Sequence, residues 1–333
     1  MLVIAPLNSF LFTSKIFSIS NNDQVFQVQK EDSGAVEGTE SNKEKPTVSN
    51  VPAPMPTFQP IKKETATNLA IPNAHSSLII DVDSKKILYE SEGNERRQIA
   101  SLTKMMTATL VMEKISDLDE LVTIGEDEVY IEGTRVGCQR SGYCISQRLK
   151  VGEKISALNL LKAMLMNSAN DAATALGRHI GGGSVDTFVD MINKKAKDMG
   201  LNDTNFCTPS GLEPDGRESE CYSTAHDIGY IAAYSMEYDL IWNIMRLPNN
   251  TIITSADGTC SHTILNTDIV LNDITNCIGG KTGFTPLAGR SLLLGVADPT
   301  GKHKIIAVLL DDPYRWQDIK TMISWAFESY EWR

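Results

Sequence analysis

Ser101 and Lys104 are the first residues along the chain whose types and spacing suggest chemistry. In a helix, this spacing places two side chains about one turn apart on the same face. A serine hydroxyl becomes a nucleophile when a base takes its proton, and a lysine is that base only where its surroundings keep it neutral. The positive field at a helix N-terminus favours both conditions. The pair therefore indicates a serine nucleophile with a lysine base, although a helix-capping serine beside an ordinary lysine has the same spacing.

Further polar motifs follow at a distance along the chain. Ser168 and Asn170, separated by a single alanine, stand in a turn between two helical segments. Lys281 is followed by Thr282 and Gly283 in a segment with the composition of a strand. Each motif alone is common by chance, but their order and their settings together are far more specific. We therefore predict that these motifs converge with the first pair in one site.

The segments around the motifs predict a domain that mixes helices and strands. Strand-like runs at 76–82 and 86–90 precede a helix at 102–115, which is apolar nearly all round. Such a helix is typically buried in the middle of a domain. The first motif is thus expected deep inside the fold.

The middle of the chain, from about 150 to 245, has mostly helical periodicity, and strands return after it. Helices are expected at 155–166, 172–180, 185–199 and 224–235. Strands are expected at 251–254, 277–283, 290–297 and 304–310, before a last helix at 319–330. Strands at both ends around a helical middle predict one antiparallel sheet covered by helices, with an inserted, mostly helical subdomain.

The N-terminal part has a different composition from the rest. Residues 18–66 are rich in polar residues and proline and have no helical or strand period, so we interpret them as a disordered linker. Residues 1–17 are interpreted as a truncated signal or anchor segment, because no Lys or Arg precedes their apolar stretch. Residues 67–333 are then the folded catalytic domain.

Composition excludes several classes of function. The chain has 333 residues, a net charge of −11, 41% hydrophobic residues and 22% charged residues. The negative charge argues against binding to nucleic acid or to anionic lipid. There is no apolar run of about 18 residues that would span a membrane. There is also no His-x-x-Glu-His or similar ligand cluster, so a zinc peptidase is disfavoured and neither a metal nor a cofactor is expected.

The six cysteines fall into three pairs that are close in sequence. These pairs are Cys138 with Cys144, Cys207 with Cys221, and Cys260 with Cys277. Local pairing would imply an oxidising compartment. Six reduced, partly buried thiols are the alternative, because the sequence alone does not select among the possible pairings.

The motifs make the chain resemble the serine penicillin-recognising acyl-transferases, the fold shared by penicillin-binding proteins and serine β-lactamases. Within this group it is most similar to the low-molecular-weight D-alanyl-D-alanine carboxypeptidases. The matching phrases are residues 99–107, 168–173 and 280–289, with weaker matches at 208–212, 223–227 and 315–327. The resemblance covers about 67–333 and implies a β-lactamase/transpeptidase-like α/β (α+β) fold.

The resemblance also implies a role for each residue of the first two motifs. Ser101 would be the nucleophile, and Lys104 would take its proton. Ser168 would pass a proton to the leaving nitrogen. Asn170 would hydrogen-bond the substrate amide and position Lys104.

The third motif would bind the substrate. Lys281 would help to keep the catalytic lysine neutral and, with the hydroxyl of Thr282, would recognise the terminal carboxylate. Gly283 would leave room for the substrate to lie along the strand edge. By resemblance, the oxyanion hole would be formed by the backbone N–H groups of Ser101 and Phe284.

The implied activity is that of a serine DD-carboxypeptidase, which removes the terminal D-alanine of peptidoglycan stem peptides through an acyl-Ser101 intermediate and is inhibited by β-lactams. A DD-endopeptidase acting on cross-links is a close alternative, because the difference lies in the shape of the groove. A β-lactamase is less favoured, since no Glu-x-x-Leu-Asn element lies between the second and third motifs. A non-catalytic peptidoglycan-binding domain would have lost Ser101 or Lys104, and both are present.

Such a substrate lies outside the cytoplasm. The resemblance therefore implies an extracytoplasmic or secreted monomer, tethered to a membrane only through its N-terminal segment. Peptidoglycan stem peptides and β-lactams would be its partners, and nucleic acid would not. In that compartment, disulfides between the sequence-local cysteine pairs become the expected state.

Overall fold

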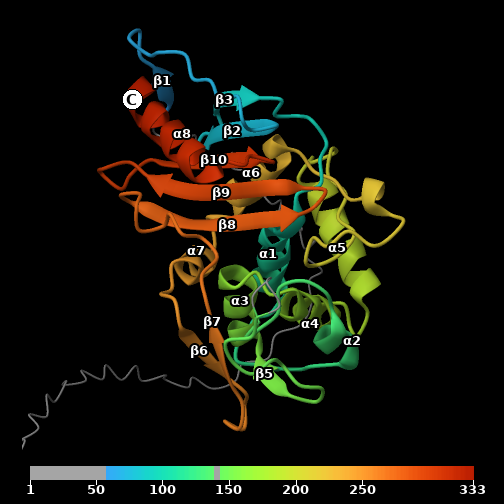
Figure 1. Cartoon of the computed structure of the whole chain (residues 1–333). Coiled ribbons are helices and arrows are strands. Elements are labelled where there is room, and N and C mark those ends of the chain that lie inside the picture. The colour runs from blue at the N-terminus through green and yellow to red at the C-terminus, as the bar shows by residue number, and fades with distance from the viewer. Residues whose placement is uncertain (1–57, 139–142) are drawn as a thin grey trace, which may run out of the picture. The chain divides into compact units, whose positions relative to one another are not determined.

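The computed structural model describes residues 58–138 and 143–333, and Figure 1 shows how their helices and strands are arranged. The helices are α1 (Lys104–Lys114), α2 (Glu126–Tyr130), α3 (Ala157–Met166), α4 (Asn170–Ile180), α5 (Val185–Asp198), α6 (Ala225–Ser235), α7 (Asp239–Met245) and α8 (Arg315–Ser329). The strands are β1 (Pro60–Lys62), β2 (Ser76–Asp81), β3 (Ile87–Ser91), β4 (Leu121–Thr123), β5 (Lys154–Ser156), β6 (Thr251–Thr254), β7 (Ser261–Ile264), β8 (Cys277–Thr285), β9 (Gly289–Ala297), β10 (Lys304–Leu310) and β11 (Tyr330–Trp332). Short 3₁₀ turns lie at Ala100–Thr103 and Glu218–Glu220.

The centre of the domain is a five-stranded antiparallel sheet with the strand order β3-β2-β10-β9-β8 (Figure 1). Its central pairing joins segments that are far apart in the sequence, with Ile80 of β2 opposite Ile306 of β10. On the other side of β10 lies β9, with Leu293 opposite Val308. The prediction of one sheet built from strands near both ends of the folded domain is confirmed.

Both faces of this sheet are buried. Along β10, Ile306 and Val308 belong to the core that includes α1 and α6, whereas Ile305 and Ala307 belong to the core under α8. This alternation is what a strand between two helical layers requires, because successive side chains point to opposite faces. Figure 1 shows α8 on one face of the sheet and α6 on the other.

Helix α1 is the element on which the first motif is built. All its residues from Lys104 to Val111 are buried, which confirms the burial predicted from its apolar composition. The helix contacts α3, α4, α5 and α6, so it lies between the sheet and the helical subdomain. It begins later than predicted, because Ala100–Thr103 forms a 3₁₀ turn before the first α-helical residue.

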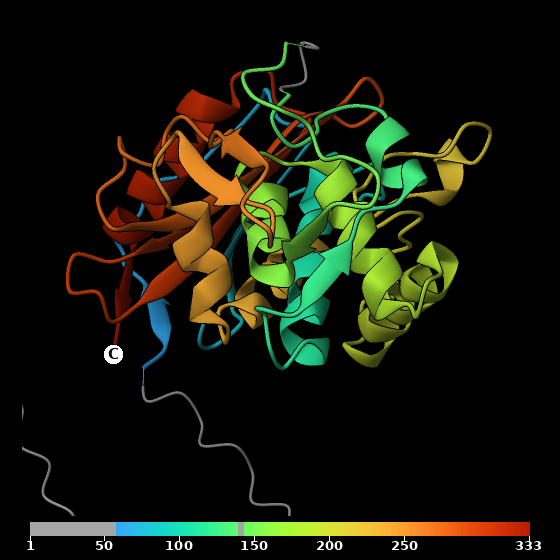
Figure 2. The same cartoon turned by 90° about the horizontal axis from the view of Figure 1, so that it is seen from below.

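The inserted subdomain is mostly helical, as predicted. Helices α3 and α4 pack against each other and against α1. The hairpins β4–β5 and β6–β7 are separate two-stranded sheets outside the main one, and Figure 2 shows the subdomain from below. This arrangement places the turn between α3 and α4, which carries the second motif, next to the start of α1.

The folded domain begins earlier than predicted. Residues Pro60–Lys62 form β1, which pairs with β11 so that Ile61 lies opposite Glu331. The predicted linker, 18–66, therefore extends too far toward the C-terminus. Its first part and the 1–17 segment lie outside the described residues. A three-residue strand has no periodicity that sequence reasoning can detect. Within 58–138 and 143–333, no helix is long and apolar enough to cross a membrane.

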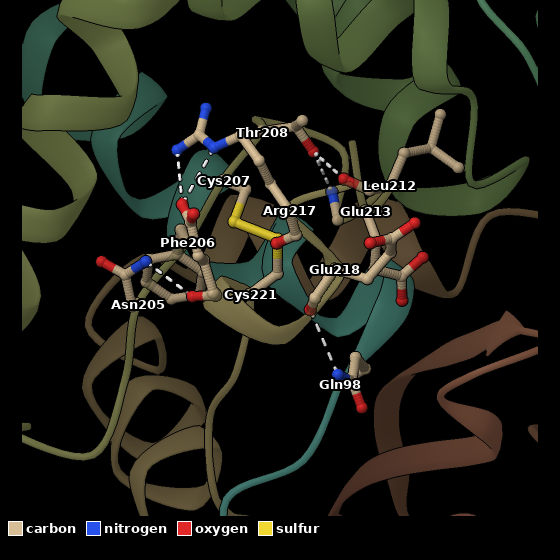
Figure 3. Close-up of a disulfide and its surroundings, with 12 residues drawn as sticks. Gln98, Asn205, Phe206, Cys207, Thr208, Leu212, Glu213, Arg217, Glu218 and Cys221 are labelled. Carbon is tan, nitrogen blue, oxygen red and sulfur yellow. Dashed lines mark hydrogen bonds and ion pairs between the residues drawn. A yellow bond between two sulfur atoms is a disulfide. The ribbon is translucent and has the colours of Figure 1, made fainter. Parts of the chain in front are cut away.

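Of the expected cysteine pairs, two are formed. Disulfides join Cys138 to Cys144 and Cys207 to Cys221, and Figure 3 shows the second with its surroundings. The third pairing is wrong, because Cys260 and Cys277 are both free and buried. Cys260 immediately precedes β7 in an outlying hairpin, whereas Cys277 begins β8 in the main sheet, so closeness in sequence did not bring them together.

Candidate active site

The turn before α1 presents Ser101 to a cavity of about 740 Å³. Ala100 has a φ of 47°, a left-handed conformation that costs a residue with a Cβ about 1–2 kcal/mol. The turn is closed by a hydrogen bond from Leu102 N–H to the Ile99 carbonyl. A strained residue directly before a candidate nucleophile is typical of a functional site.

Lys104 is fully buried directly behind Ser101. Its Nζ lies 2.8 Å from Ser101 Oγ, 2.8 Å from Asn170 Oδ1 and 2.6 Å from the carbonyl oxygen of Ser210. Burial, and next the charge of Lys281, hold the pKa of Lys104 well below its usual range, against the opposing effect of Asp171. The lysine is therefore in the kind of site that favours a neutral amine.

A neutral amine on Lys104 has two N–H groups to donate, and two acceptors face it. The amide oxygen of Asn170 and the carbonyl oxygen of Ser210 are acceptors only, so they take both N–H bonds. The nitrogen lone pair is then left facing the hydroxyl of Ser101 at 2.8 Å. This geometry can remove the serine proton without any rearrangement of the lysine.

The second motif contacts both lysines, Asn170 contacting Lys104 and Ser168 contacting Lys281. Ser168 has a φ of 56°, and its Oγ accepts a hydrogen bond of 2.9 Å from Lys281 Nζ. Asn170 is the first residue of α4, and its Nδ2 donates to the carbonyl of Glu132 at 2.9 Å. The amide of Asn170 is thus fixed so that its oxygen faces Lys104.

Lys281 lies in the middle of β8 and is also buried. Besides its bond to Ser168, its Nζ donates to the carbonyl of Thr282 at 2.9 Å. Burial lowers the pKa of Lys281 to about 7, against the charge of Asp268, which raises it. Near neutral pH this lysine is therefore partly protonated, and it is the main source of charge that disfavours a proton on Lys104.

The rest of the third motif lines the cavity. The hydroxyls of Thr282 and Thr267 are 2.7 Å apart, which orients the Thr282 side chain. A Cβ on Gly283 would lie 3.0 Å from the carbonyl of Ile99, so the glycine allows β8 to approach the nucleophile turn. Phe284 is 39% exposed and also lines the cavity.

The structure thus brings together every residue that the sequence predicted for the site. Ser101, Ser168, Asn170, Thr282, Gly283 and Phe284 all line the same cavity, with the two lysines behind them. Sequence reasoning missed the Ser210 carbonyl, although 208–212 was among the weaker matches. A backbone acceptor has no signature in a sequence because every residue carries one.

Arg315, the first residue of α8, was also missed and lines the cavity. It was part of the weakly matching segment 315–327, but nothing in its position along the chain places it near β8. Four acidic residues line the cavity as well; they are Glu132, Glu213, Asp215 and Glu218. Glu213 is fixed by a 2.7 Å hydrogen bond from Thr285. The cavity therefore has both cationic and acidic groups on its walls.

Comparison with known proteins agrees with this site. A family model described as D-alanyl-D-alanine carboxypeptidase matches residues 62–314. The D-alanyl-D-alanine carboxypeptidase DacF of Bacillus subtilis is 29% identical over 265 residues, which cover 78% of this chain and 63% of that protein. A D-alanyl-D-alanine endopeptidase of Escherichia coli is 30% identical over 236 residues, which cover 70% of this chain and 71% of that protein.

Solved structures agree with the fold. A penicillin-binding protein of Listeria monocytogenes, in its ampicillin-bound form, has a TM-score of 0.65 and 27% identity, covering 78% of this chain and 99% of that chain. The chain spans slightly less than two thirds of the Bacillus relative, at 63%. All of the motif residues lie inside the matched range, 62–314. The predicted family is therefore confirmed, and the chain belongs to the D-alanyl-D-alanine carboxypeptidase family.

Proposed function

We propose that the protein is a serine DD-carboxypeptidase, which removes the terminal D-alanine from peptidoglycan stem peptides. The observation that carries the proposal is the buried amine of Lys104, which lies 2.8 Å from the hydroxyl of Ser101. The D-alanyl-D-alanine carboxypeptidases that resemble this chain support the same reaction.

Acylation starts at Ser101. Its Oγ attacks the carbonyl carbon of the penultimate D-alanine, and its proton passes to Nζ of Lys104. The carbonyl oxygen becomes an oxyanion, which the backbone N–H groups of Ser101 and Phe284 stabilise. Asn170 holds Lys104 in position and donates a hydrogen bond from its amide to the substrate backbone.

Release of the leaving group needs a proton. When the tetrahedral intermediate collapses, the C–N bond breaks and the leaving nitrogen takes the proton that Lys104 accepted, passed on through the hydroxyl of Ser168, so that Lys104 is neutral again. Lys281 Nζ lies 2.9 Å from that hydroxyl and holds it in place. Free D-alanine departs and an ester on Ser101 remains. A water molecule then attacks this ester and Lys104 takes the water's proton. As the bond between the carbonyl carbon and Ser101 Oγ breaks, Lys104 returns this proton to Oγ, which releases the shortened peptide and regenerates the free serine.

The cationic wall suits the carboxylate of the leaving D-alanine. Lys281 supplies a positive charge, Thr282 supplies a hydroxyl, and Arg315 lines the same cavity. A guanidinium presents paired donors that match a carboxylate. The third motif and Arg315 therefore form the proposed carboxylate pocket.

DD-endopeptidase activity on cross-links is the second candidate. One observation favours it: the Escherichia coli relative carries that name. The same Ser101 ester would form in either case, and only the size of the leaving group differs. Each reaction predicts a different released product.

The test uses labelling and product analysis together. Wild-type protein should form a covalent adduct with a fluorescent penicillin, and Ser101→Ala should not. An absence of adduct on folded wild-type protein would overturn the acyl-enzyme proposal. Release of D-alanine from a pentapeptide supports the carboxypeptidase, cleavage of cross-linked dimers without it supports the endopeptidase, and turnover of nitrocefin alone supports a β-lactamase.

We propose, further, that the protein works outside the cytoplasm as a monomer. Stem peptides are found there, and the two disulfides suit an oxidising compartment. A membrane tether, if present, would run through residues outside the described range. Fractionation of cells expressing the full chain, with cross-linking of the purified protein, checks location and oligomeric state.

A further inference from the structure

The segment between Cys207 and Cys221 forms one wall of the cavity. Gly211, Leu212 and Glu213 line the cavity from its first half, and Glu218 lines it from its second half. The disulfide closes the segment at its base, with a sequence separation of 14. Figure 3 shows the carboxylates of Glu213 and Glu218 on the same side of the disulfide.

This segment touches the catalytic machinery through its backbone. The carbonyl of Ser210 accepts a 2.6 Å hydrogen bond from Lys104 Nζ, and the carbonyl of Pro209 accepts a 2.7 Å bond from Thr107 Oγ1 in the same helix. Gly211 lies so close to the nucleophile turn that a Cβ there would be 1.9 Å from the carbonyl of Ala100. The position of this wall therefore determines where the Ser210 carbonyl, a hydrogen-bond acceptor for Lys104, lies.

We propose that the Cys207–Cys221 disulfide is a positioning element for the lysine base. It holds the Ser210 carbonyl against Nζ, so that the nitrogen lone pair stays directed at Ser101. Opening the disulfide would loosen this wall and slow acylation. The proposal rests on the proposed function, since it concerns the base of the same reaction.

The second half of the segment is held by hydrogen bonds as well as by the disulfide, which is flanked by a backbone pair between Asn205 and Tyr222. Its residues from Asp215 to Arg217 are exposed. It is tied to its surroundings by the 3.1 Å bond from Gln98 to the Glu218 carbonyl and the 2.7 Å bond from Asn205 to the Glu220 carbonyl. The disulfide is the covalent link between the two halves, and Cys207 and Cys221 are both partly exposed, so a reductant can reach it.

The expected signature is a change in pH dependence. The charged groups that act on Lys104 are Lys281 from β8 and Asp171 from α4, while burial has the largest effect on its pKa. A looser wall admits water, which solvates the ammonium form and raises the pKa of Lys104. The acylation rate then begins to rise only at a higher pH. If the disulfide had only a structural role, its reduction would lower the stability of the protein but leave this pH dependence unchanged.

The experiment uses a background with a single disulfide. Cys138→Ser/Cys144→Ser leaves Cys207–Cys221 as the only disulfide, and a water-soluble phosphine then opens it. The disulfide reacts with one phosphine and one water to give two thiols and one phosphine oxide, so the phosphine is the two-electron reductant. We expect the rate constant for acylation by a fluorescent penicillin to fall at least about tenfold, with its rise shifted to higher pH, and to recover on reoxidation.

The outcomes separate the two proposals. Circular dichroism must show that the reduced protein is still folded. If the oxidised protein is not acylated at all, the proposed function is wrong. If the oxidised protein is acylated, and the folded, reduced protein is acylated at the same rate with the same pH dependence, the positioning role is overturned.

A second set of variants avoids the reductant. Thr107→Val removes the hydroxyl that holds the Pro209 carbonyl, so it should slow acylation in the same direction as reduction does. Thr109→Val is the matched control, because the Thr109 hydroxyl bonds to the Met105 carbonyl of its own helix. Equal acylation rates in the two variants would count against a role for the wall in holding the base.

Discussion

The hydroxyl of Ser168 lies 2.9 Å from the buried ammonium of Lys281, so the second and third motifs meet directly across the cavity. The first and second motifs meet at Asn170, whose Oδ1 lies 2.8 Å from Lys104 Nζ. The motifs are therefore one hydrogen-bonded unit rather than three independent sites. A change to one motif should therefore alter the hydrogen bonding of the others.

The charge of Lys281 should govern substrate affinity near neutral pH. Burial lowers its pKa to about 7, so a rise in pH through this value removes the positive charge that we propose binds the substrate carboxylate. We expect KM for a D-Ala-D-Ala peptide to rise above about pH 7. Steady-state kinetics between pH 5.5 and about 9 measure this. In Lys281→Arg, which stays charged, the rise should disappear, and an identical profile in both proteins would contradict the assignment.

Substitution of Ser168 should separate backbone strain from hydroxyl chemistry. Its φ of 56° suits glycine better than a residue with a Cβ. We expect Ser168→Gly to be more stable than Ser168→Ala by about 1 kcal/mol. Both variants lose the hydroxyl, so both should lose about 10²-fold or more in turnover of the peptide. Thermal unfolding and D-alanine release give the two readouts, and full activity in either variant would exclude Ser168 from proton transfer.

Gly211 should not tolerate a side chain, because the backbone of the nucleophile turn lies too close to it. Gly211 has a φ of 81°, and a Cβ there would lie 1.9 Å from the Ala100 carbonyl. Gly211→Ala should displace the nucleophile turn and reduce acylation at least about tenfold.

Gly216 provides the control for that prediction. It has a similar φ of 77°, but nothing lies within 4 Å of its would-be Cβ. Gly216→Ala should cost only about 1 kcal/mol of unfolding free energy, from its conformation alone, and should keep the acylation rate. Loss of acylation in both variants would point to a general effect of stability.

Arg315 should contribute to recognition of the substrate carboxylate. It lines the cavity, whereas Arg290 is exposed on β9, opposite Phe284. We expect Arg315→Ala to raise KM for the peptide about tenfold, in line with a loss of about 1.4 kcal/mol of binding. Arg290→Ala should leave KM within about twofold. Similar effects in both variants would mean that the loss of a positive charge in general, rather than of one on the cavity wall, is responsible.

The sequence predicted the fold where its periodicity was strong. The all-round apolar character of α1 predicted its burial, and the strands at both ends around a helical middle predicted one antiparallel sheet covered by helices. It could not predict β1, since three residues with a mixed pattern give no periodic signal. It also paired Cys260 with Cys277 by proximity, although disulfide connectivity depends on which loops the fold brings together.

The site was predictable where chemistry resides in side chains. Ser101, Lys104, Ser168 and Asn170 formed recognisable motifs. In the structure Lys104 bonds to Ser101 and Asn170, and Ser168 bonds to Lys281. The Ser210 carbonyl was not predictable, because any residue type supplies the same acceptor. Arg315 was not predictable as a cavity residue either, because its place depends on how α8 lies against the sheet.

The pairing of Ile80 with Ile306 has a consequence for how the chain acquires its structure. Strand β2 is synthesised early, and every one of its residues is buried in the finished domain. Its partner β10 comes near the end of the chain, so the contact order of the sheet is high and closure is slow. Until β10 emerges, β2 presents an unpaired apolar edge that is prone to aggregation. The nascent chain should therefore depend on a chaperone that shields residues 76–81.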